Sequence, residues 1–136
     1  MVGNNETLET HHQAVIATLK AQSANRVLRS LNTEGKSLRP LQKEFPSGNE
    51  TDGGIALACS IRPPGEENFQ VWPPLARPLV GEIPPGELFP HHVDLLAKFG
   101  HADILRLVAF YNDSFGIQLE DSLEQRVDKF RRWCMS

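Results

Sequence analysis

Three histidines and two aspartates gather in the second half of the chain, where they could bind a metal ion or transfer protons. They are His91, His92, Asp94, His101 and Asp103. A zinc site on a helix commonly spaces its ligands as in HExxH or HxxxH, and neither spacing occurs here. We therefore interpret the aspartates as residues of helix N-termini and expect no metal and no other cofactor. A small enzyme with a site at His91, His92 and His101 stays a second alternative.

Nucleophilic catalysis would need a reactive cysteine or an activated serine. Cys59 lies in an apolar run, where the pKa of a thiol rises and its reactivity falls, and Cys134 is the third residue from the end. The sequence has no G-x-S-x-G element, no P-loop and no CxxC pair. We therefore expect no catalytic residue and a function that is not enzymatic.

A basic cluster closes the chain. Arg126, Lys129, Arg131 and Arg132 come before Trp133 and could contact phosphates or an acidic protein. The competing interpretation is an exposed helix face whose cations complement the negative end of the helix dipole.

The same region carries a resemblance to a known family. The element Phe110-Tyr111, with Phe115-Gly116 after three residues and a charged helix that ends at Trp133, resembles part of the DnaD-type helical domain of replication-restart proteins. The resemblance covers 24 of the 136 residues. It implies nucleic-acid binding and supports, as the alternative function, an accessory protein that binds nucleic acid through the basic helix end.

A proline-rich arm lies in the middle of the chain. Residues 73–90 contain six prolines, a density that neither a helix nor a central strand tolerates. Apolar residues such as Leu75 and Leu79 are interleaved, so we expect an extended segment with its apolar side chains turned inward or toward a partner. Trp72 precedes the prolines and is of a residue type that is over-represented at binding hot spots. We predict a partner-binding set of Trp72, Leu75, Leu79, Arg126, Lys129, Arg131, Arg132 and Trp133.

Helices must position most of these residues. Leu8, Val15 and Leu19 recur at helical spacing and predict a helix from Thr7 or Thr10 to about Leu31, although Ser23 and Asn25 interrupt its apolar stripe. Three helices are predicted near the C-terminus, over 92–99, over 102–115 and from a capping box at Asp121–Glu124 onward. The helix over 102–115 carries the apolar stripe Ile104, Leu107, Val108, Tyr111 and Phe115.

A β-hairpin is predicted between the linker and the arm. Apolar residues alternate from Ile55 to Ile61, Pro64-Gly65 is a favoured turn pair, and residues 68–72 alternate again. The sequence therefore predicts an α+β, mostly helical fold. Its parts are an N-terminal helix, a small β-hairpin, a proline-rich extended arm and a C-terminal three-helix unit.

The predicted organisation is one compact domain. Residues 1–43 form an N-terminal helical segment, and residues 44–54 form a flexible joint, because they contain three glycines and few apolar residues. Residues 55–136 hold the hairpin, the arm and the helical unit.

The composition of the chain argues against several classes of function. The net charge of −3 argues against a general coat for nucleic acid or membrane. The N-terminus lacks the basic and apolar segments of a signal peptide, and no apolar run is long enough to span a membrane, so we expect a cytoplasmic protein. We predict a non-enzymatic adaptor or regulator, or a subunit of a larger assembly. Its partner would be another protein or a second copy of the chain.

Overall fold

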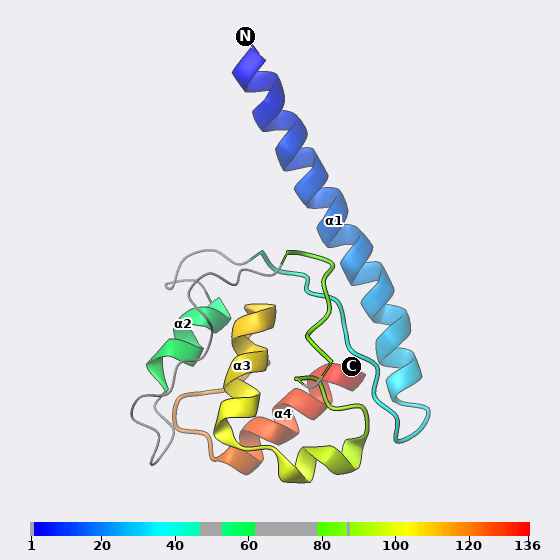
Figure 1. Ribbon diagram of the computed structural model, residues 1–136, viewed down its shortest axis with the longest axis vertical. Helices are drawn as coiled ribbons and strands as arrows, with labels where there is room; N and C mark the ends of the chain where they lie inside the picture. Colours follow the sequence, from blue (N-terminus) through cyan, green and yellow to red (C-terminus); the bar gives the residue numbers. More distant parts are fainter. Residues whose placement is uncertain (1, 47–52, 62–78, 87) are drawn as a thin grey trace.

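The computed structural model describes residues 2–46, 53–61, 79–86 and 88–136. Within these ranges the chain forms the α-helices α1 (Val2–Asn32), α2 (Gly53–Ser60), α3 (His101–Tyr111) and α4 (Leu123–Met135), and the 3-10 helix η1 (Val93–Lys98). Figure 1 shows α2, α3, α4 and η1 gathered into a body. Helix α1 packs on the body near its C-terminal end and extends away from it toward the N-terminus.

The predicted β-hairpin is wrong. The residues of its proposed first strand form helix α2, and those of its second strand, 68–72, lie outside the described part of the chain. The described residues contain no strand. Ser37 and His92 form an isolated antiparallel β-bridge. A short apolar run has no periodicity that separates a strand from a buried helix, and the alanines within it favour the helix. The described fold is therefore mostly helical rather than α+β.

Helix α3 forms the centre of the core. Its apolar stripe is buried as predicted, with Ile104, Leu107 and Val108 fully inaccessible to solvent. The helix ends at Tyr111, earlier than the sequence predicted, because Asn112 takes up the left-handed conformation at the C-cap. Phe115 and Gly116 also have positive φ, and the turn that they form leads the chain back toward α4.

Helix α4 begins one residue later than expected. The capping box is made by Ser122 and Gln125, whose side chains each accept a hydrogen bond from the backbone N–H of the other. Asp121, the predicted cap, instead accepts hydrogen bonds from the Gln118 backbone and from Lys129. These interactions lower the pKa of Asp121, the Gln118 bond most.

An aromatic cluster joins α4 to the rest of the body. The ring of Phe130 lies 5.2 Å from that of Phe115 and 5.7 Å from that of Phe89, between ring centroids. Trp133 packs 4.6 Å from Tyr111 and 4.5 Å from Phe115. Aromatic pairs at these distances stabilise a core beyond the area that they bury.

The segment 36–46, which follows α1, lies between α1 and the body (Figure 1). The Leu38 N–H donates to the His91 carbonyl, and Lys43 exchanges backbone hydrogen bonds with Glu82 and Gly81. The end of the proline-rich arm is therefore attached to this segment. Within the arm, Phe89 is buried, whereas Leu79 and Ile83 are exposed to solvent.

Candidate functional site

Two asparagines attach α1 to the segment 36–46. The side-chain amide of Asn25 both donates to and accepts from the backbone of Gln42, at 2.8 and 2.7 Å. Asn32 makes the same two bonds with Arg39, at 3.2 and 2.8 Å. Both asparagines are fully buried. They are seven positions apart, so they lie almost on one line along the helix. Asn25, which interrupts the apolar stripe in the sequence, is therefore a main anchor of α1.

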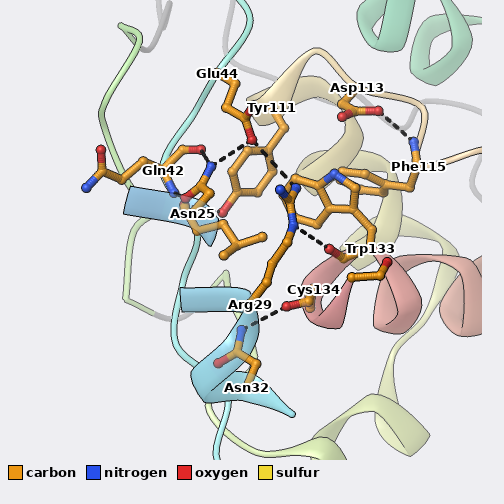
Figure 2. A network of polar contacts seen from close by, with 12 residues as sticks. Asn25, Arg29, Asn32, Gln42, Glu44, Tyr111, Asp113, Phe115, Trp133 and Cys134 are labelled. Atoms are coloured by element: carbon orange, nitrogen blue, oxygen red, sulfur yellow. Dashed lines mark hydrogen bonds and ion pairs between the residues drawn. The ribbon is translucent and has the colours of Figure 1, made fainter. Parts of the chain in front are cut away.

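Arg29 extends this anchor to α4 (Figure 2). Its Nε donates to the carbonyl oxygen of Trp133 at 3.0 Å, and its guanidinium lies 5.3 Å from the centroid of the Trp133 ring. The same guanidinium lies 3.6 Å from the carboxylate of Glu44. The last half of α1 is thus attached both to the segment 36–46 and to the end of α4.

The side of α1 that faces away from this anchor carries exposed apolar residues among polar ones such as Ser23 and Arg26. Val15, Ile16, Leu19 and Val27 are 43%, 37%, 57% and 61% exposed, and we call these four residues the apolar face of α1. At about 100° per residue they span about 120° of the helix surface. Asn25 and Asn32 lie roughly opposite, so α1 uses one side to pack on the body and presents the other to solvent.

No function was predicted from the sequence for the apolar face of α1. Its signal was present in the spacing of Val15, Ile16 and Leu19, which matches one helix face. The buried side of the helix is marked by Ala21, Asn25 and Asn32, two of which are polar.

The four residues of the predicted basic cluster have different environments in the structure. Arg126 is buried, and its guanidinium donates to the Leu119 carbonyl at 2.9 Å and lies 3.4 Å from His101 Nδ1. Lys129 binds Asp121 and the Gly116 carbonyl. Arg131 and Arg132 are exposed, and both pair with Asp128, at 3.6 and 2.9 Å.

The remaining predicted partner-binding residues lie apart from one another. Trp133 is partly buried in the aromatic cluster and under Arg29. Leu79 is 70% exposed at the turn that Lys43 holds. Trp72 and Leu75 lie outside the described residues.

The histidines have structural partners. Nδ1 of His92 accepts from the Asp94 N–H at the start of η1, and Nε2 of His91 lies 3.0 Å from the Gly86 carbonyl. Asp103 accepts from the Gly100 N–H at the start of α3, as expected for an aspartate at a helix N-terminus. Over the described ranges, no group of three or more His, Cys, Asp or Glu residues could hold a metal ion.

The cysteines differ in their surroundings. Cys134 is buried in α4, and burial raises the pKa of its thiol well above the ordinary value, so little thiolate forms near neutral pH. Cys59 is exposed on α2, not in the apolar strand that the sequence analysis predicted.

A shallow groove of about 420 Å³ lies between η1 and α4. Val93, Leu96 and Val127 supply apolar lining, and Glu124 and Asp128 supply acidic side chains at its edge. The two carboxylates are on successive turns of one exposed helix face, where charged residues are common.

Comparison with known proteins identifies no relative of this chain. No family model, no curated protein and no solved structure matches the chain, so the resemblance of residues 110–133 to the DnaD-type helical domain has no support from these comparisons. Among the described helices, none is long and apolar enough to cross a membrane.

Proposed function

We propose that this chain is a non-enzymatic protein-binding component, either an adaptor or regulator or a subunit of a larger assembly, and that it binds its partner through the apolar face of α1. The observation that carries the proposal is the exposure of Val15, Ile16, Leu19 and Val27 on the side of α1 opposite its anchor. Single exposed apolar residues are ordinary, but several on one side of a helix favour its use as an interaction surface.

The position and composition of the first half of α1 support the same proposal. Figure 1 shows the first half of α1 extending beyond the body, where the helix has no support from the core. Residues 2–12 of α1 include glycine, asparagines, threonines and histidines, which are weak helix formers. A partner packed on Val15 and Ile16 would bury apolar surface at the end of this half that adjoins the anchored part of α1.

The charges favour a protein partner over nucleic acid. The half of α1 over residues 2–17 contains no Lys or Arg, so it offers no cation to a phosphate. At the other candidate surface Arg126 is buried, and the exposed Arg131 and Arg132 share Asp128. Neither surface presents the row of available cations that phosphate binding requires.

Site-specific photo-crosslinking tests the proposal. A photoreactive phenylalanine analogue replaces Ile16 in the full chain, which is expressed in its native cells and irradiated. The matched control carries the analogue at Glu120, which is exposed on the body. We expect a protein adduct from position 16 and not from position 120. Absence of an adduct at position 16, or equal labelling at both positions, would contradict the proposal.

A further inference from the structure

We infer that the segment that binds the apolar face of α1 is an acidic amphipathic helix of another protein, whose carboxylates contact Lys20 and Arg26. This inference rests on the proposed function and names the chemistry of the partner. It uses the position of the two cations beside the apolar face and the absence of carboxylates along this part of α1.

Two exposed cations adjoin the apolar face. Lys20 and Arg26 are both open to solvent. Arg26 follows Leu19 by seven positions and Val27 follows Lys20 by seven, so each cation lies only about 20° around the helix from one of these apolar residues. Each is therefore about two turns from an apolar side chain and almost in line with it. A partner that covers Leu19 and Val27 would meet both cations.

Helix α1 offers these cations no carboxylate. Residues 10–33 contain no Asp or Glu, so neither Lys20 nor Arg26 can form an ion pair with a residue three or four positions away. Among the described residues, neither of them is in an ion pair. Arg29, which points toward the body, lies 3.6 Å from the Glu44 carboxylate. A partner on the other side of α1 would complement Lys20 and Arg26 best with carboxylates of its own.

The dimensions of the apolar face suit a helix. Val15 and Val27 are twelve positions apart, about 18 Å along α1, which equals between three and four turns of a partner helix. An amphipathic helix presents an apolar stripe at the same spacing, with charged residues along its flanks. Glutamates on these flanks would reach the two cations, whereas lysines there would place like charges together, which lowers affinity.

A lipid surface is a less suitable occupant, although it can also combine apolar and anionic groups. Helices that lie on membranes commonly insert Trp or Phe, and residues 2–32 contain no aromatic residue. Recognition of anionic lipids usually needs about four to eight cations, and only Lys20 and Arg26 adjoin the apolar face. The observations therefore favour a protein helix.

Binding of designed peptides to the full chain, measured by fluorescence anisotropy, tests the inference. The probe is a labelled helix of about three heptads, with leucine at positions a and d and glutamate at e and g, and its counterpart has lysine at e and g. The wild type should bind the glutamate peptide roughly tenfold more tightly than the lysine peptide. The double variant Lys20→Glu, Arg26→Glu should reverse this preference. Leu19→Asp should weaken the binding of both peptides.

A matched variant controls for net charge. Lys36→Glu with Lys98→Glu makes the same change of charge at two exposed lysines outside α1 and should keep the preference of the wild type. Circular dichroism confirms that each variant stays folded. Equal binding of the two peptides by the wild type, no binding of either peptide, or the same reversal in the control variant would overturn the inference.

Two further measurements examine other occupants. The first is cosedimentation with vesicles of phosphatidylserine and phosphatidylcholine, and the second is sedimentation of the chain alone. Vesicle binding that the Lys20, Arg26 variant loses, without a preference for the glutamate peptide, would replace the protein helix by a lipid surface. A concentration-dependent dimer that this variant abolishes, again without that preference, would replace it by a second copy of the chain.

Failure of this inference is distinguishable from failure of the proposed function. The photo-crosslinking experiment at position 16 is repeated with Lys20→Glu and Arg26→Glu in the same chain, which should reduce the adduct. An undiminished adduct would mean that the apolar face binds a protein without the inferred carboxylates. No adduct at position 16 in either chain would remove both the inference and the proposed function.

Discussion

The side-chain amide of Asn32 donates a hydrogen bond to the backbone oxygen of Cys134 at 3.0 Å, across 102 positions of sequence. This bond joins the last residue of α1 to the last turn of α4. Because a helix is rigid over a few turns, the attachments at Asn25, Arg29 and Asn32 decide the direction in which the rest of α1 leaves the body (Figures 1 and 2). Polar contacts therefore determine the direction in which the apolar face of α1 points.

Replacing Asn32 by alanine should destabilise the fold by roughly 2–4 kcal/mol, because the buried carbonyl of Cys134 and the partly buried backbone groups of Arg39 lose their hydrogen-bond partner. Chemical denaturation of the full chain measures this change. Ser23→Ala on the exposed side of the same helix is the control and should change the free energy of unfolding by less than about 0.5 kcal/mol. Equal stability of the two variants would show that the anchor contributes little.

The second prediction concerns Lys43, whose side chain is buried and donates to the Phe110 carbonyl. Burial lowers the pKa of Lys43 from 10.5 to about 8, against the opposing effect of the Glu82 carboxylate. Between these two pKa values the unfolded chain binds one more proton than the folded chain, so the free energy of unfolding rises with pH. The slope is up to about 1.4 kcal/mol per pH unit.

This rise should be limited to a narrow range of pH. Burial raises the pKa of the Cys134 thiol above its ordinary 9.0 and that of the Tyr111 hydroxyl above 10.0. Above pH 9 the unfolded chain therefore loses protons that the folded chain keeps, which offsets the effect of Lys43 and outweighs it once Tyr111 also contributes above pH 10. We expect the free energy of unfolding to increase from pH 8 to about 9 and then to level off or decline. Lys43→Met should remove the increase, and Lys98→Met, at an exposed lysine, should keep it.

Gly54 is a point of close approach between α2 and the C-terminal end of α3. A Cβ atom at this position would lie 2.3 Å from the Asp113 nitrogen and 2.8 Å from the Val108 carbonyl oxygen, which are backbone atoms that cannot rotate away. Gly54→Ala should force the two helices apart and destabilise the fold by on the order of 1–3 kcal/mol. Gly35→Ala is the matched control, because its Cβ would meet no atom within 4 Å. Thermal melting compares the two, and an unchanged Gly54→Ala variant would contradict this packing.

The last prediction addresses the nucleic-acid alternative. We expect no measurable binding of DNA or RNA at physiological salt, because Arg131 and Arg132 share Asp128 and the other cations of α4 serve internal contacts. Fluorescence anisotropy with labelled oligonucleotides measures this. The double variant Arg131→Ala, Arg132→Ala should stay folded, since exposed ion pairs contribute little to stability. Binding by the wild type that weakens steeply with salt and disappears in the double variant would favour the nucleic-acid function.

Local patterns in the sequence were sufficient for much of the helical framework. The apolar stripe from Ile104 to Tyr111 is continuous. A polar residue followed by Glu or Gln three positions later predicts the start of α4. The long N-terminal helix was likewise visible in the spacing of its apolar residues. These features depend on residues a few positions apart, so the sequence alone contains the information that determines them.

The tertiary structure alone decided the features that involve distant parts of the chain. Residues 53–60 are helical and pack against α3 at a glycine, although their alternation suits a strand equally well. Asn25 and Asn32 mark the buried side of α1 only because backbone groups at Gln42, Arg39 and Cys134 lie opposite them. Arg126 does not contribute to the predicted basic surface, because its guanidinium contacts the Leu119 carbonyl and His101 inside the body. Which side of a helix is buried depends on what packs against it, and residues far apart in the sequence supply that partner.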